Sequence, residues 1–155
     1  METPMGKSGN EKKFMTSKNV FFDTNILVYA FDKADEKKQD ISKTLMLEAI
    51  ETGRGNISTQ VLQEFYVVAT TKLGILPELA LTTMDSFGYL NVITITPEMI
   101  RSAIKKQTKF VLSFWDALIL QSAESSLSSI LYTEDLNDGQ KYDSISVMNP
   151  FANKQ

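Results

Sequence analysis

Residues 20–30 read V-F-F-D-T-N-I-L-V-Y-A and join a short apolar run to a helical pattern through one acidic residue, Asp23. The apolar run predicts a buried strand at residues 20–22, and residues 25–30 continue with helical character. Asp23 therefore stands at the carboxyl end of the first strand. In open α/β sheets, ligands bind in the crevice beyond such strand ends. This junction is the first candidate for a functional site.

The alternation of strand and helix continues along the chain. Further strands are predicted at residues 56–58, 92–95, 130–132 and 145–148, and helices at 38–50, 59–72, 77–87, 97–106 and 113–125. Gly53 and Gly55 are expected to end the first long helix, and Gly74 the next. The pattern predicts a three-layer α/β/α sandwich with a short, mainly parallel sheet of about five strands. Residues 1–18 are polar and predict a disordered tail, which leaves 19–155 as one domain.

Composition limits the chemistry available to this domain. The 155 residues include no cysteine and no histidine, which excludes disulfides, thiolate zinc sites and Ser-His-Asp triads. Nineteen acidic against 16 basic residues give a net charge of −3, so coating of nucleic acid by charge alone is not expected. No run of about 20 apolar residues and no amino-terminal apolar leader is seen, and a cytoplasmic protein is expected.

Four acidic residues lie where a fold without a site would not place them. Asp23 and Asp135 closely follow predicted strands, at the carboxyl edge of the sheet. Asp116 has Ile119 and Leu120 on its own face of a helix, so its carboxylate rises from an apolar surface. A buried charge without a partner is very costly. Glu64 lies on the flank of another apolar helical stripe.

Each of these acids also has a purely structural interpretation. Asp23 is a suitable cap for the helix that follows it, and Ser113-x-x-Asp116 resembles a capping box, although Asp is not its usual Glu or Gln. Glu64 alone is an ordinary solvated acid, and residues 134–139 alone are a polar turn. The combination of all four favours a shared site. Carboxylates brought together raise one another's pKa, and a hard cation such as Mg²⁺ relieves that repulsion and assists attack on phosphate.

Four motifs in this chain resemble those of the PIN domain family, particularly the VapC-like toxin ribonucleases of bacterial and archaeal type II toxin–antitoxin systems. They are residues 20–30, quoted above, S-T-Q-V-L-Q-E-F-Y at 58–66, S-F-W-D-A-L-I-L at 113–120 and Y-T-E-D-L-N-D-G-Q at 132–140. Their order and spacing fit the family over roughly residues 19–151. The resemblance implies a PIN-like nuclease domain that hydrolyses RNA with Mg²⁺, or with Mn²⁺ as a substitute.

The same resemblance implies roles for individual residues. The family's four acidic positions fall on Asp23, Glu64, Asp116 and Asp135. Asp23 and Asp116 are implied to be the direct metal ligands, and the other two to complete the pocket, partly through water. Five further residues are implied to support them by hydrogen bonds or extra negative charge: Thr24, Asn25, Thr133, Glu134 and Asp138.

The grip on RNA is expected from residues outside the acidic pocket. Basic candidates are Lys33, Arg101 and Lys105, although ordinary solvated faces explain them equally well. Aromatic candidates for stacking on bases are Tyr29, Phe31 and Trp115, with core packing the better expectation for Trp115. The resemblance also implies a cognate antitoxin that covers the pocket with a basic side chain, and a homodimer.

Two other functions remain open at this point. One is a catalytically silent PIN-like binding scaffold in which the acids are structural; an intact set of four disfavours it, and metal binding discriminates. The other is a phosphatase that uses a covalent aspartate. The haloacid-dehalogenase pattern requires Asp-x-Asp after its first strand, whereas this chain has Asp23-Thr24-Asn25 and lacks the second acid.

Overall fold

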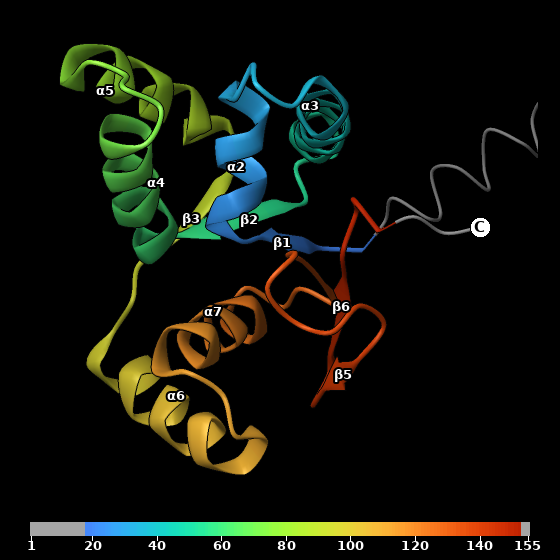
Figure 1. Cartoon of the computed structure of the whole chain (residues 1–155). Helices are drawn as coiled ribbons and strands as arrows, with labels where there is room; N and C mark the ends of the chain where they lie inside the picture. The colour runs from blue at the N-terminus through green and yellow to red at the C-terminus, as the bar shows by residue number, and fades with distance from the viewer. Residues whose placement is uncertain (1–17, 153–155) are drawn as a thin grey trace, which may run out of the picture.

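The computed structural model describes residues 18–152, and its centre is a six-stranded sheet (Figure 1). The predicted disordered tail lies, except for Lys18, outside the described residues. The spatial order of the strands is β3-β2-β1-β4-β6-β5. Their bounds are β1 Val20–Phe22, β2 Gly55–Ser58, β3 Asn91–Ile93, β4 Ile130–Tyr132, β5 Lys141–Tyr142 and β6 Ile145–Met148. All five predicted strands are present, and all pair in parallel.

The sixth strand, β5, is the one that the sequence pattern did not predict. It has two residues and pairs antiparallel with β6, with Lys141 opposite Ser146 and Tyr142 opposite Ile145. A turn with Asp143 at a φ of 53° connects the two strands. A pair of residues carries no alternating apolar pattern, so this strand exists only through its pairing with β6.

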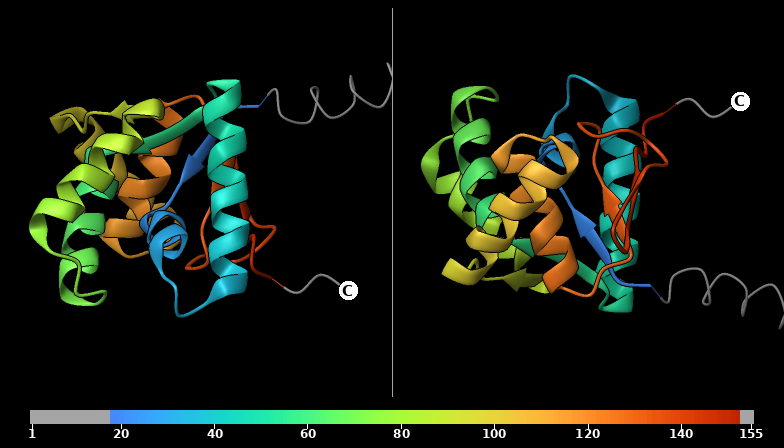
Figure 2. Two further views of the ribbon diagram at one scale, coloured as in Figure 1. Left: turned by 90° about the horizontal axis from the view of Figure 1, so that it is seen from above. Right: turned by 90° about the horizontal axis from the view of Figure 1, so that it is seen from below.

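Helices cover both faces of the sheet, which confirms the three-layer prediction (Figures 1 and 2). One layer contains α2 Thr24–Phe31, α3 Glu36–Thr52, α4 Thr59–Thr71 and α5 Pro77–Ser86, followed by the short 3₁₀ helix η1 Phe87–Tyr89. The other contains α6 Pro97–Phe110 and α7 Phe114–Ser125, which pack closely against each other. Within residues 18–152, none of the helices combines the length and the apolar character that crossing a membrane requires.

The helix ends show why two neighbouring glycines follow α3. Gly53 caps the helix with a left-handed φ of 68°, which glycine adopts without steric cost. Gly55 serves a different purpose: a Cβ there would lie 2.6 Å from a methyl group of Leu90 and 2.8 Å from the Cβ of Ala49. The absence of a side chain therefore allows α3 and Leu90 to pack against the start of β2.

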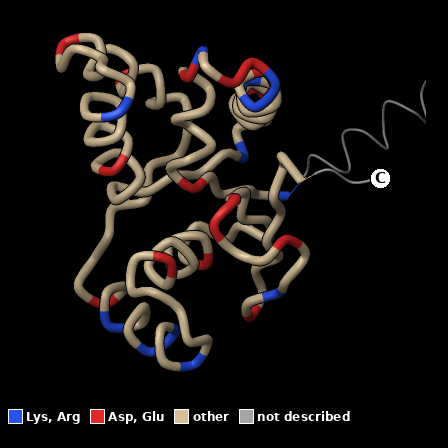
Figure 3. The backbone as a smooth tube through the Cα atoms, viewed as in Figure 1, with Lys and Arg blue, Asp and Glu red and all other residues tan. Residues whose placement is uncertain are grey.

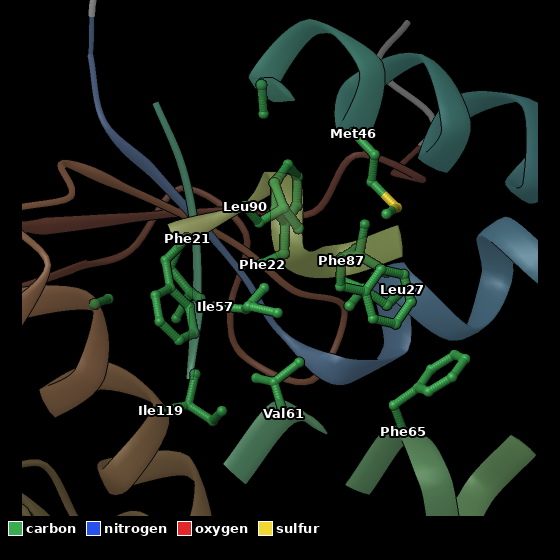
Figure 4. Packing of buried hydrophobic residues seen from close by; sticks show 14 of the residues in the cluster. Phe21, Phe22, Leu27, Met46, Ile57, Val61, Phe65, Phe87, Leu90 and Ile119 are labelled. Atoms are coloured by element: carbon green, nitrogen blue, oxygen red, sulfur yellow. The ribbon is translucent and has the colours of Figure 1, made fainter. Parts of the chain in front are cut away.

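The main core lies on both faces of the sheet, against α2–α4 on one side and α7, with Ile119, on the other (Figure 4). Phe21 and Phe22 on β1 are fully buried, and so is Ile57 on β2. Phe65 of α4 meets Phe87 edge to face at 4.9 Å, and Phe31 packs edge to face against both rings. Edge-to-face packing of this kind adds to the free energy gained by burial. It fixes α2 and α4 over the carboxyl ends of β1 and β2.

Candidate active site

Asp23 is held rigidly at the junction of β1 and α2. It is the N-cap of α2, and its Oδ1 accepts a hydrogen bond of 2.7 Å from the backbone N–H of Thr24. Its Oδ2 accepts a hydrogen bond of 2.7 Å from the hydroxyl of Thr133, which follows β4. Only 6% of Asp23 is exposed. The interpretation of Asp23 as a helix cap is therefore correct. The same hydrogen bonds hold its carboxylate in place near those of Glu64 and Asp135.

Glu64 and Asp135 approach Asp23 from two neighbouring segments. Glu64 projects from α4, and its Oε1 accepts a hydrogen bond of 3.4 Å from the Thr24 hydroxyl. Asp135 accepts a hydrogen bond of 3.0 Å from the Asn25 side-chain amide, and its own backbone N–H donates to Thr133 Oγ1 at 3.1 Å. Thr24, Asn25 and Thr133 thus each bond directly to one of the predicted carboxylates.

Asp116 completes the group from the other helical layer. It lies in the first turn of α7, whose N-cap Ser113 accepts a hydrogen bond of 3.1 Å from the Asp116 backbone N–H. Ser113 therefore caps the helix, and among the hydrogen bonds of residues 18–152 none uses the Asp116 carboxylate to return that cap. The Gln60 amide of α4 donates to the Trp115 carbonyl oxygen at 3.3 Å, which ties this turn to the carboxyl edge of the sheet.

The charges of the four carboxylates act on one another's pKa values. Burial raises the pKa of Asp23 to about 7, with further upward contributions from the charges of Asp135 and Glu64. Burial also raises the pKa of Glu64, helped by the charges of Asp116 and Asp135. The pKa of Asp135 is raised by burial and then by Asp116 and Glu134. Glu64 and Asp135 are each coupled to both Asp23 and Asp116.

A groove of about 750 Å³ opens over this cluster. Its lining includes Asp23, Glu64 and Asp135, together with Lys72 and Leu73 at the end of α4, whereas Asp116 is not among the described residues that line it. A second hollow of about 590 Å³ shares Asp32, Ala34 and Leu73 with the groove and adds Lys33. Three of the four carboxylates therefore lie in a groove that adjoins a second hollow, and the two together offer room for part of a chain-like substrate.

The donor set of this cluster fits a hydrated hard cation. All four groups offer carboxylate oxygen, the ligand type that Mg²⁺ prefers, and a cation would relieve the repulsion that raises three of the pKa values. Within residues 18–152, however, no group of three or more Asp or Glu side chains is placed so that it could hold a metal ion. Mg²⁺ keeps several waters and needs only one or two carboxylates. The arrangement suits that mode rather than a closed cage of protein ligands.

Glu134 and Asp138, the two additional acids, lie in different surroundings. Glu134 accepts a short hydrogen bond from the Tyr29 hydroxyl and forms an ion pair of 3.0 Å with Lys38. Lys38 also lies 4.4 Å above the Tyr29 ring. Asp138 accepts a hydrogen bond from the backbone N–H of Asn149 at 2.9 Å. The link between Lys38 and Glu134 was not predicted, because 96 positions separate them and no local pattern joins them.

The predicted RNA contacts are dispersed over the surface. Lys33 lines the second hollow, whereas Arg101 and Lys105 are exposed on α6, where Figure 3 shows a row of basic positions. Phe31 is partly buried and packs against the core, and it also lines the second hollow. The expectation that Trp115 packs in the core is wrong, because 62% of this residue is exposed. Trp115 lies in the first turn of α7, before the buried residues of that helix, which begin at Ala117.

Fold and site together define a class of α/β protein in which acidic side chains gather at the carboxyl edge of a short parallel sheet. The chain belongs to the PIN domain family, whose model matches residues 20–141. No curated protein sequence matches it.

Solved structures share this fold at low sequence identity. The sarcin–ricin-loop-cleaving toxin VapC20 of Mycobacterium tuberculosis is 17% identical, with a TM-score of 0.63 over 76% of this chain and 90% of that one. A toxin–antitoxin complex from Klebsiella pneumoniae gives 22% identity and a TM-score of 0.64, over 86% and 98%. VapBC2 of Rickettsia felis, bound to a fragment of promoter DNA, gives 21% and 0.61, over 84% and 97%.

Proposed function

We propose that this protein is a Mg²⁺-dependent endoribonuclease that hydrolyses phosphodiester bonds of RNA, and that it is the toxin of a toxin–antitoxin pair. One observation carries the proposal: Asp23, Glu64 and Asp135, from three separate segments, line one groove at the carboxyl edge of the sheet, and the charge of Asp116 raises the pKa of two of them. Keeping such groups together without a cation costs free energy, which is characteristic of functional sites. Membership of the PIN domain family supports the same activity.

The residues present have distinct parts in this proposal. Asp23 and Asp116 would hold the ion, and Glu64 and Asp135 would orient its waters. A bound Mg²⁺ supplies a water of lowered pKa and stabilises negative charge on the phosphate; Mn²⁺ would substitute. Thr24 and Thr133 fix both oxygens of Asp23, so this ligand needs no reordering when the ion binds. Asn25 holds Asp135 in the same way.

Substrate and protein partners follow from the surface around the site. Lys33 would contact the RNA backbone along the groove, with Arg101 and Lys105 on α6 a more distant set. An antitoxin that presents a basic side chain would be attracted to the acidic cluster. Exposed leucines on and before α5 offer a surface for a homodimer: Leu76, Leu79 and Leu81. We place this activity in the cytoplasm, where RNA and antitoxin are both present.

One observation keeps the silent scaffold as a second candidate. The absence, within residues 18–152, of three acids arranged to hold an ion is what a PIN-like fold without catalysis would show. The phosphatase is less well supported, because Asn25 occupies the required second acidic position and its amide is bonded to Asp135.

The deciding experiment measures cleavage of a mixed pool of single-stranded RNA with Mg²⁺, Mn²⁺ or EDTA. Asp116→Asn is tested in parallel, with Asp85→Asn, an exposed acid of α5, as the matched control. Metal-dependent cleavage that only Asp116→Asn abolishes supports the nuclease. Calorimetric titration with Mg²⁺ accompanies the assay. Metal binding without cleavage indicates a narrow target or a retained antitoxin, whereas absence of both favours the scaffold. Turnover of small phosphomonoesters would instead favour the phosphatase.

A further inference from the structure

A separate groove adjoins the carboxylate cluster between α4 and α7. It has a volume of about 360 Å³ and is lined by Gln60, Gln63, Glu64, Val67, Val68 and Trp115. Glu64 and Val68 also line the groove over the carboxylates, so the two depressions meet at Glu64. A polymer held at the carboxylates could therefore place its next unit in this second groove.

Trp115 gives this groove an aromatic wall. It immediately precedes Asp116 in the first turn of α7, and 62% of it is exposed. Its ring meets Phe114 edge to face at 5.1 Å, which restricts its orientation and leaves the remaining surface open. A large aromatic side chain exposed beside a site supplies a surface for stacking.

Gln60 adds an unused hydrogen-bonding group to the same groove. Only 3% of Gln60 is exposed, and its amide nitrogen is already used by the Trp115 carbonyl. Its Oε1 is buried and has no hydrogen-bond partner within residues 18–152. Buried polar atoms are nearly always paired, so an unpaired acceptor at the wall of a groove points to a ligand that donates an N–H.

The chemistry of this lining identifies the class of ligand. Among the described residues that line the groove, Glu64 alone is charged, which disfavours a phosphate there. An aromatic face, two amides and two valines suit a flat ring that carries N–H groups. We propose that this groove binds an unpaired nucleobase of the RNA, stacked on Trp115, next to the phosphodiester held at the carboxylates. This inference rests on the proposed ribonuclease function.

Trp115 is the only tryptophan in the chain, so its own fluorescence reports on the groove. The measurement uses the Asp23→Asn variant with Mg²⁺, because the proposed function makes that variant inactive and the RNA stays intact. A short oligoadenylate is titrated against an abasic ribose-phosphate oligomer of equal length and charge. Stacking predicts quenching by the oligoadenylate and little quenching by the abasic oligomer. Equal quenching by both would overturn the proposal.

A second measurement compares RNA affinity among variants by the fluorescence anisotropy of the labelled oligoadenylate. In the same background, Trp115→Ala should weaken binding roughly 5- to 150-fold, the range for loss of one base–aromatic stack. Trp115→Phe should retain most of the affinity. The control is Tyr89→Ala. Tyr89 is 75% exposed and precedes β3, so it lies at the amino edge of the sheet, away from the carboxylates. Its loss should leave the RNA affinity unchanged. Unchanged affinity in Trp115→Ala, with metal-dependent cleavage by the wild type, overturns only the base site. Absence of RNA binding, of Mg²⁺ binding and of cleavage by the wild type overturns the proposed function as well.

Discussion

Thr133 and Asp23, which lie 110 positions apart, are joined by a hydrogen bond of 2.7 Å from the Thr133 hydroxyl to Asp23 Oδ2. The same hydroxyl oxygen accepts the backbone N–H of Asp135 at 3.1 Å. Thr133 is fully buried, and this one oxygen connects the carboxylate of Asp23 to the backbone of Asp135. The resemblance to the PIN domain family implies a supporting role for Thr133, and the geometry makes that role specific enough to test.

Thr133→Val should destabilise the fold by about 1–3 kcal/mol, because a methyl group leaves the Asp135 N–H without its acceptor and removes a donor from Asp23. The hydrogen bond from Thr133 lowers the pKa of Asp23, so its loss should raise that pKa further. Urea unfolding and the pH dependence of Mg²⁺ binding measure the two effects. Thr133→Ser, which keeps the hydroxyl, should resemble the wild type. Equal behaviour of the two variants would show that the hydroxyl is unimportant.

The metal-free protein should become less stable as pH rises from about 4 to about 7. Burial raises the pKa of Asp23 from 3.8 to about 7, so in this range the folded state keeps a proton that the unfolded chain has lost. Since the unfolded state binds fewer protons, stability falls with rising pH and levels off above the folded pKa. The raised pKa values of Glu64 and Asp135 act in the same direction.

Unfolding curves at several pH values in EDTA test this prediction. In Asp23→Asn the decline should be clearly smaller, because the largest single contributor has been removed. A decline of the same size in the variant and the wild type would contradict the assignment to Asp23.

Much of this arrangement could be predicted from the sequence because it depends on local patterns. The apolar residues 20–22 predicted a buried strand that ends at Asp23, and the apolar stripe of α4 predicted a helix packed on the sheet. Together these patterns indicated the layers of the fold and the edge of the sheet at which Asp23 lies. The end of α6 could not be located in the same way. It was expected near residue 106 and lies at Phe110, because Val111 takes the left-handed position where a glycine would have marked the end. The exposure of Trp115 was not predicted either. Helical spacing places Trp115 on the same face as Leu118 and Ile119, which are both buried, so the pattern indicates a buried position for Trp115 as well.

Asp116→Asn should keep the fold, lose Mg²⁺ binding and abolish cleavage. The Asp116 side chain is not part of the α7 cap, which Ser113 supplies, so its amide analogue should leave the helix intact. Removing its charge also removes a repulsion that raises the pKa values of Glu64 and Asp135, and the metal-free protein should be slightly more stable. Circular dichroism, thermal unfolding and calorimetry measure these changes. Loss of the fold would instead favour a structural role for Asp116.

Lys38→Met should weaken Mg²⁺ binding several-fold at neutral pH. Lys38 holds Glu134 through an ion pair of 3.0 Å, and Glu134 is the neighbour of Asp135 in the loop after β4. Without Lys38, the loop that carries Asp135 loses its attachment to α3, and we expect this loss of positioning to outweigh the extra attraction that the uncompensated charge of Glu134 exerts on the cation. Calorimetry with Mg²⁺ measures the change. Lys37→Met, at an exposed position on the same helix, is the control and should bind Mg²⁺ normally. Equal affinities would show that the ion pair does not position the loop.

Val111→Gly should stabilise the protein by roughly 0.5–1 kcal/mol, the cost of a left-handed β-branched residue less the extra chain entropy of glycine. Val111 has a φ of 56°, and 89% of it is exposed, so little packing is lost with the side chain. Its backbone N–H, which donates to the Gln107 carbonyl, is unaffected. Val111→Ala separates the two causes, because alanine retains the Cβ and should recover little of the strain. If glycine destabilises the protein as measured by urea unfolding, the turn between α6 and α7 is unstrained, and the valine contributes packing that its exposure does not indicate.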